Sequence, residues 1–115
     1  MILGTGIDII EIDRIKKAID RWGDHFTHHV FNEEEILYAQ RHKNPYQHFA
    51  GRFAAKEAVF KAVGDQKMGW KDLTITNDTD GKPTCRYSAQ GFNKKIHISI
   101  SHSKDYAVAS AIVTP

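Results

Sequence analysis

The stretch PYQHFAGRFAAKEAVFKAVG, residues 45–64, carries the longest helical pattern in the chain. It begins with a proline, which suits the first turn of a helix, and it ends with Gly64, a typical residue just past a helix end. Its aromatic residues recur at helical spacing and form an apolar stripe of Phe49, Phe53 and Phe60. Its alanines leave room for another backbone or a ligand to approach. We therefore predict a long helix over residues 45–63.

The residues before this helix predict one strand and two shorter helices. Residues 2–10 are rich in isoleucine and contain two glycines, which predicts a strand that another backbone can approach closely. A helix follows it and ends at Gly23; its apolar stripe is Ile12, Ile15, Ile19 and Trp22. Asn32 and Glu35 resemble a capping box, so a further helix is expected from Glu33 to about Arg41.

The second half of the chain alternates apolar and polar residues, which is typical of strands. Short strands are expected over residues 73–76, 84–88, 96–101 and 106–113, with a turn at Asp80 and Gly81 between the first two. The expected fold class is α+β, with an antiparallel sheet packed against a long central helix. The length fits a single domain over residues 1–115.

The composition argues against several classes of protein. Sixteen basic and fourteen acidic residues leave a formal net charge of +2, and aromatic residues are not interleaved with basic ones, so a nucleic-acid partner is not expected. No stretch approaches the roughly twenty apolar residues that span a bilayer, and no signal peptide is expected. Cys85 is alone, lies in a strand-like run, and is interpreted as a structural residue. A lone cysteine suits a reducing cytosol, so the expected location is cytoplasmic, with no membrane partner.

Glu57 and Lys61 lie four residues apart in the long helix and therefore share a face. The simple explanation is a surface ion pair, which contributes about 0.3–0.5 kcal/mol. The same two groups also suit a metal-bound phosphate, because the carboxylate can hold the cation while the lysine neutralises phosphate oxygens. Both explanations remain open for this helix taken alone.

Two further polar segments stand at the ends of apolar strands. Asp8 could cap the helix that follows, although Glu11 and Asp13 are closer to its start. Together with Glu57, Asp8 would form a two-carboxylate site suited to Mg²⁺. Ser101–His102–Ser103 offers either a turn or a set of donors for a phosphate. A serine–histidine hydrolase is disfavoured, because adjacent strand residues point to opposite faces and no Gly-x-Ser-x-Gly motif is present.

Several motifs together resemble the holo-acyl-carrier-protein synthase family, the small single-domain branch of the 4'-phosphopantetheinyl transferase superfamily. They are GIDIIEI at residues 6–12, FAAKEA at residues 53–58 with Lys61 after it, Gly81-Lys82-Pro83, and ISISHS at residues 98–103. Their order and spacing fit that family over nearly the whole chain. The chain departs from it after Gly64, where many members carry Gly-Thr-Gly and this sequence continues Asp-Gln-Lys-Met-Gly.

The resemblance implies a 4'-phosphopantetheinyl transferase-like fold. It also implies transfer of 4'-phosphopantetheine from coenzyme A to a serine of apo acyl carrier protein, with release of 3',5'-ADP, in support of fatty acid biosynthesis. It implies Mg²⁺ as cofactor, held by Asp8 and Glu57, with Lys61 at the coenzyme A phosphates. Glu57 is also the candidate base, so that Glu57 and Lys61 are the expected catalytic residues. Further contacts to coenzyme A are expected from Arg52, Gly64, Ser101, His102 and Ser103.

The resemblance also implies partners. A basic face of the first helix, formed by Arg14, Lys17 and Arg21, would dock an acidic acyl carrier protein, although pairing with nearby aspartates is the simpler explanation. A homotrimer with active sites at subunit interfaces is expected. Two alternatives remain: a small nucleic-acid-binding domain, or an inert scaffold that only binds the carrier protein. The co-occurrence of Asp8, Glu57 and Lys61 argues against a scaffold.

Overall fold

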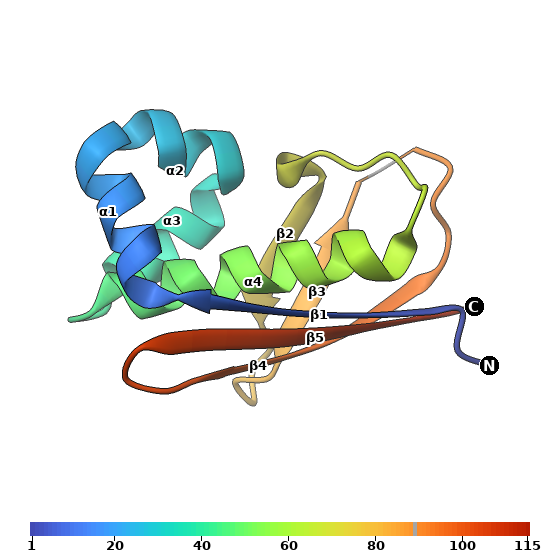
Figure 1. Cartoon of the computed structure of the whole chain (residues 1–115). Coiled ribbons are helices and arrows are strands. Elements are labelled where there is room, and N and C mark those ends of the chain that lie inside the picture. Colours follow the sequence, from blue (N-terminus) through green and yellow to red (C-terminus); the bar gives the residue numbers. More distant parts are fainter. Residues whose placement is uncertain (89) are drawn as a thin grey trace.

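The computed structural model describes residues 1–88 and 90–115, and its elements are labelled in Figure 1. In chain order they are β1 (Gly4–Glu11), α1 (Ile12–Trp22), α2 (Asp24–Val30), α3 (Glu33–Gln40), α4 (Pro45–Val63), the 3-10 helix η1 (Trp70–Asp72), β2 (Leu73–Asn77), β3 (Pro83–Tyr87), β4 (Lys95–His102) and β5 (Tyr106–Thr114). No helix in these two ranges is both long enough and apolar enough to cross a membrane.

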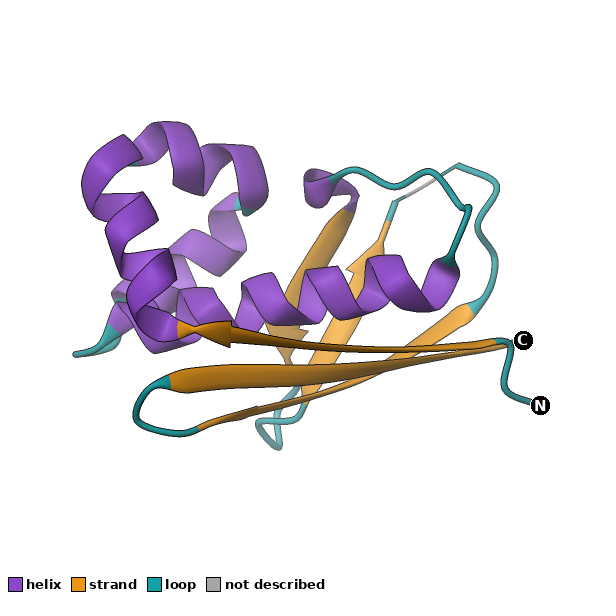
Figure 2. Ribbon diagram, viewed as in Figure 1, coloured by secondary structure: helices purple, strands orange, loops and turns teal. Residues whose placement is uncertain are grey.

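The strands form two antiparallel sheets rather than the single sheet expected. One has the order β1-β5-β4, and the other pairs β2 with β3. Figure 2 shows α4 running along β1 on one face of the three-stranded sheet, with α1, α2 and α3 gathered near the N-terminal end of α4. The predicted α+β class, with antiparallel strands packed on a long central helix, is confirmed.

The backbone of β1 lies directly against α4. A Cβ atom added at Gly4 would stand 2.0 Å from the carbonyl oxygen of Ala62, and one added at Gly6 would stand 2.0 Å from that of Ala58. Both positions therefore require glycine. Two strand residues advance about 6.6–6.8 Å, close to the roughly 6 Å that four helical residues advance. Asp8 is the next residue on this face of β1, and it is consequently level with the following turn of α4 toward the helix N-terminus.

This close approach decides which face of α4 is buried. Its wholly covered positions are mostly small, namely Ala50, Ala54, Ala55, Ala58 and Val59. Of the predicted apolar stripe, Phe49 is buried, whereas Phe53 and Phe60 are only half-buried. Both rings pack against Trp70 beside the core, with centroid distances of 5.1 Å for Phe53 and 5.0 Å for Phe60.

The helices before α4 match the prediction from the sequence only in part. The capping box of Asn32 and Glu35 is present at the start of α3. However, α2 was not predicted, because its polar sequence shows no apolar stripe, although Thr27 and Val30 are buried. Trp22 was expected in the buried stripe of α1, and its exposed fraction is instead 52%. The chain turns at Gly23 immediately after it.

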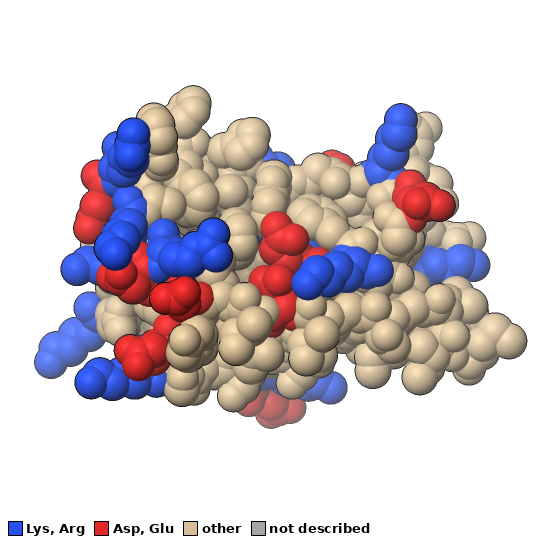
Figure 3. Space-filling view, viewed as in Figure 1, with Lys and Arg blue, Asp and Glu red and all other residues tan. Residues whose placement is uncertain are grey.

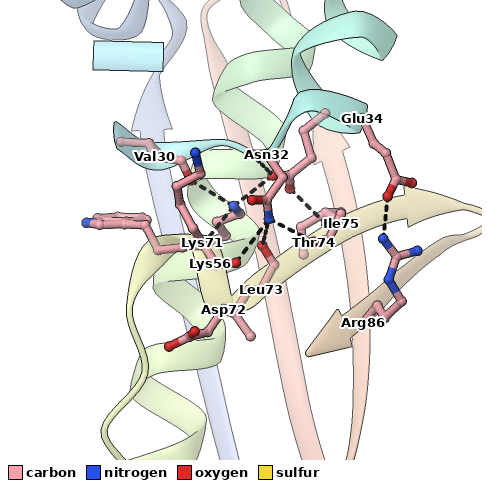
Figure 4. Close-up of polar contacts among 12 residues, drawn as sticks. Val30, Asn32, Glu34, Lys56, Lys71, Asp72, Leu73, Thr74, Ile75 and Arg86 are labelled. Atoms are coloured by element: carbon pink, nitrogen blue, oxygen red, sulfur yellow. Dashed lines mark hydrogen bonds and ion pairs between the residues drawn. The ribbon is translucent and has the colours of Figure 1, made fainter. Parts of the chain in front are cut away.

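A buried ion pair joins the helices to the smaller sheet (Figure 4). The Nζ atom of Lys56 donates to Glu35 Oε1 at 2.8 Å, to Val30 O at 2.8 Å and to Trp70 O at 2.9 Å. The same carboxylate accepts from the backbone N–H groups of Asn32 and Ile75. Burial lowers the pKa of Lys56, and the charge of Glu35 opposes that shift. Every proton of the ammonium group is thus used inside the core.

Candidate functional site

The fold brings Asp8 and Lys61 into contact, although they lie on different elements. Asp8 stands on the inner face of β1, paired in register with Ala109 of β5. The Nζ atom of Lys61 lies 3.3 Å from Asp8 Oδ1 and donates to the carbonyl oxygen of Ile7 at 2.9 Å. The exposed fractions of the two side chains are 17% for Asp8 and 55% for Lys61. Their contact occurs at the surface, where a ligand can reach both groups.

Glu57 lies one helical turn before Lys61 on the same half-exposed strip of α4. Burial raises the pKa of Glu57, the negative charge of Asp8 raises it further, and the positive charge of Lys61 lowers it. Asp8 and Lys61 therefore lie close enough for their charges to act on Glu57. Figure 3 shows acidic side chains gathered at the middle of this face, over α4 and β1, beside basic ones.

The donor set suits a hard divalent cation. Asp8 and Glu57 offer carboxylate oxygens, and Mg²⁺ in proteins commonly takes one or two carboxylates and completes its shell with water and substrate phosphate. Within residues 1–88 and 90–115, no cluster of three or more His, Cys, Asp or Glu side chains forms a complete metal cage.

Arg52 lies on a different side of α4. Its guanidinium donates to Asn77 Oδ1 at 2.7 Å and covers the ring of Tyr38 at 4.0 Å from the centroid. Its exposed fraction is 4%, and its buried Nε has no hydrogen-bond partner among the residues that the structure describes. A groove of about 500 Å³ opens beside it between α3 and β2, lined also by Arg41 and Thr76. Arg52 is therefore a buried cation at the edge of a groove, facing α3 and β2.

The predicted serine–histidine segment lies near Arg52. Ser101 and His102 end β4, and Ser103 begins the turn to β5, where its Oγ accepts from the backbone N–H of Tyr106 at 3.3 Å. All three residues are exposed. Burial lowers the pKa of His48 to about 4, and the charges of His42, Arg52 and His102 lower it in the same direction. His48 and its stacked neighbour His42 were not predicted as part of this group, because no metal-ligand spacing marked them.

The structure thus places the predicted residues in two groups rather than one. Asp8, Glu57 and Lys61 form the first, between β1 and α4. The second is looser: Arg52 donates to Asn77 of β2, and His102 lies at the end of β4. Gly64 caps α4 with a φ of 67°, one turn after Lys61, and so adjoins the first group.

The basic face of α1 is exposed as expected. Lys17 pairs with Asp13 at 2.8 Å, and the guanidinium of Arg21 covers the ring of Trp22 at 4.8 Å. A hollow of about 260 Å³ lies beside this face; it is lined by Trp22, His25, Phe26 and His29. Simple pairing with aspartate therefore accounts for Lys17 but not for Arg21. Sequence reasoning missed the hollow because three of its four lining residues belong to α2, which was not predicted.

Cys85 of β3 is half-buried, and burial raises the pKa of its thiol to about 12. A thiol that stays protonated is a poor nucleophile. This agrees with a structural residue.

Comparison with known proteins gives consistent matches over the whole chain. The family described as the 4'-phosphopantetheinyl transferase superfamily matches residues 4–111. A holo-[acyl-carrier-protein] synthase from Thermodesulfovibrio yellowstonii is 49% identical, and the match covers 99% of this chain and all of that protein. The crystal structure of a Bacillus anthracis holo-(acyl-carrier-protein) synthase in complex with CoA (3',5'-ADP) matches with a TM-score of 0.87 and 40% identity, over 99% of this chain and 97% of that one. A Neisseria meningitidis holo-[acyl-carrier-protein] synthase matches with a TM-score of 0.88 and 31% identity, over the full length of both.

Proposed function

The chain belongs to the 4'-phosphopantetheinyl transferase superfamily, and on that premise we propose that it transfers 4'-phosphopantetheine from coenzyme A to a serine of an acyl carrier protein. The observation that carries this proposal is the meeting of Asp8 of β1 with Glu57 and Lys61 of α4. Relatives that match over their full length carry the name of this activity, and one structural neighbour holds the coenzyme product 3',5'-ADP.

Asp8 and Glu57 are the residues that would hold a magnesium ion. Such an ion supplies positive charge to the pyrophosphate of the coenzyme when it is bound. The protein contributes the positions of the two carboxylates: β1 fixes Asp8 by its contact with α4, and α4 itself carries Glu57. Lys61 is half-exposed on the same strip and supplies a further positive charge to the phosphate oxygens.

In the reaction, the carrier serine Oγ attacks the β-phosphorus of coenzyme A, and the bond from that phosphorus to 3',5'-ADP breaks. Phosphoryl-type transfer depends mainly on positioning and charge neutralisation, which these residues provide. The serine must also lose its proton. Glu57 is the proposed acceptor, directly or through a water bound to the ion, because its carboxylate lies one helical turn from Lys61 within this group.

The carrier protein docks on α1 in this proposal. Arg14 and Arg21 offer exposed positive charge to an acidic partner, and the hollow beside Trp22 offers apolar surface next to it. Complementary charge of this kind speeds encounter and sets orientation. Figure 3 shows basic side chains gathered over the position of α1, at the same face as the acidic group on α4.

We also propose a homotrimer with active sites at subunit interfaces, as the family resemblance implies. The outer face of the β1-β5-β4 sheet exposes apolar side chains, among them Ile7, Ile9 and Ile112. Exposed apolar patches of this kind commonly mark interfaces. A neighbouring copy would also bring the group of Arg52 and His102 toward the coenzyme bound at Asp8 and Glu57 of the first copy.

A direct test incubates the protein with coenzyme A, magnesium and apo carrier protein. We expect the carrier protein to gain the mass of one phosphopantetheine, with an equal amount of 3',5'-ADP released. Asp8→Asn should abolish the gain while leaving the circular dichroism spectrum unchanged. A nucleic-acid-binding domain or an inert scaffold would give no mass change with the unmutated protein, and that result would refute the proposal.

The trimer has its own test. Light scattering on the purified protein should give three times the mass of one chain, and Ile7→Lys with Ile9→Lys should give monomers. If the unmutated protein is a monomer at assay concentration, the proposed trimer is refuted.

A further inference from the structure

Lys61 is bound to the strand that carries Asp8, not merely close to it. Its ammonium donates to the main-chain carbonyl of Ile7 at 2.9 Å and lies 3.3 Å from the Asp8 carboxylate. The backbone contact orients the side chain across the gap from α4 to β1. Asp8 is the more buried partner, so the lysine covers one of its oxygens from the exposed side.

This contact conflicts with a cation on Asp8. A magnesium ion binds carboxylate oxygen at about 2.0–2.1 Å. With Lys61 at its present distance from the same oxygen, the two positive centres would lie within a few ångströms and repel each other strongly. The ion can therefore use this oxygen of Asp8 only when the lysine moves away.

We propose that Lys61 is an internal counter-ion for Asp8, and that it ties magnesium binding to coenzyme binding. This rests on the proposed function, in which Asp8 holds the ion and Lys61 meets the phosphates. Without the coenzyme, Lys61 competes with the ion for Asp8. When the coenzyme arrives, its phosphate oxygens attract Lys61 and free Asp8 for the ion.

The structure makes such a change easy. The side chain of Lys61 is more than half exposed, and exposed ion pairs contribute little to stability. Lysine carries its charge on a flexible stem, so the ammonium can swing while α4 stays in place. By linkage, a coenzyme that favours the ion must be favoured by it to the same degree. The free protein should therefore bind magnesium weakly.

Calorimetric titration of the full-length protein with Mg²⁺, with and without saturating coenzyme A, tests this inference. Lys61→Met should bind Mg²⁺ without coenzyme about tenfold more tightly than the unmutated protein, because one positive charge next to the ion is gone. The gain in Mg²⁺ affinity on adding coenzyme should be smaller in Lys61→Met by a similar factor. Lys61→Arg keeps the charge and should resemble the unmutated protein in the absence of coenzyme.

Two controls separate this inference from the proposal beneath it. Lys82→Met removes an equal charge from the exposed β2–β3 turn and should leave Mg²⁺ affinity unchanged. If Asp8→Asn leaves Mg²⁺ affinity unchanged in the presence of coenzyme, the metal site itself is wrong. If Asp8→Asn abolishes binding but Lys61→Met binds no more tightly than the unmutated protein, the counter-ion role is refuted and the metal site stands.

Discussion

Replacing Lys56 with methionine removes an ammonium group that is wholly enclosed between α3, α4 and η1. The variant loses three hydrogen bonds, to Val30 O, Glu35 Oε1 and Trp70 O. It also leaves the carboxylate of Glu35, whose exposed fraction is 0%, without its counter-charge. Breaking a buried ion pair by removing one partner costs about 3–5 kcal/mol. For a chain of this length that corresponds to a fall in Tm of roughly 10–20 °C.

Urea denaturation followed by circular dichroism measures this cost, with an unchanged m value showing that the loss lies in the folded state. The matched control is Arg86→Met, which breaks the exposed pair between Arg86 and Glu34 seen in Figure 4. That change should cost no more than about 1 kcal/mol.

Adding Glu35→Gln to Lys56→Met should recover part of the loss, because a neutral amide removes the buried charge yet can still accept from one of the backbone N–H groups. A Lys56→Met variant as stable as the Arg86→Met control, or a double variant less stable than either single one, would refute this account of the core.

Three further outcomes follow from other parts of the structure. Gly6→Ala should lower both Tm and transfer rate, because its Cβ would stand 2.0 Å from the carbonyl oxygen of Ala58 and push β1 away from α4. The pKa of His48 is about 4 in the folded protein and near 6.5 when unfolded, so unfolding takes up a proton between these pH values. Stability should therefore fall as the pH drops from about 6.5 to 4. His48→Gln should flatten that part of the curve of Tm against pH. Reversing Arg14 and Arg21 to glutamate should raise KM for the carrier protein far more than KM for coenzyme A, and added salt should imitate part of the loss.

Each of these has a matched control. Thr5 lies next to Gly6 on the exposed face of β1, so Thr5→Ala should leave Tm and the transfer rate nearly unchanged. Parallel Tm curves for His48→Gln and the unmutated protein would contradict the proton linkage. If the charge reversal at Arg14 and Arg21 raises both KM values equally, α1 is an ordinary solvated surface. The same conclusion follows if KM for the carrier protein does not depend on salt concentration.

The features that the sequence predicted well depend on local chemistry. The long helix begins at Pro45 and ends at Val63 as expected, and the capping box of Asn32 forms. The family assignment from the motifs is also confirmed. Each of these signals needs only a few neighbouring residues, because proline, glycine and capping side chains act on the backbone beside them.

The features that the sequence missed depend on contacts between distant segments. Nothing near Lys56 in the sequence shows that its partner is Glu35, twenty-one residues earlier, which was expected only as part of a capping box. The exposure of Trp22 follows from the turn into α2, an element without an apolar stripe. The separation of Arg52 from Glu57, despite their closeness in the chain, follows from which neighbours cover each side of α4.

The spacing of residues along β1 nearly matches the spacing of turns along α4. Two strand residues span about 6.6–6.8 Å and four helical residues about 6 Å. Facing positions on the two elements therefore stay level over only a few residues. Gly4 and Gly6 occupy two of these facing positions, and Asp8 is the next residue on the same face of β1. Inserting or deleting one residue between Gly6 and Asp8 would turn the carboxylate to the opposite face of the sheet. The chemistry of this site is therefore sensitive to any change in the length of β1.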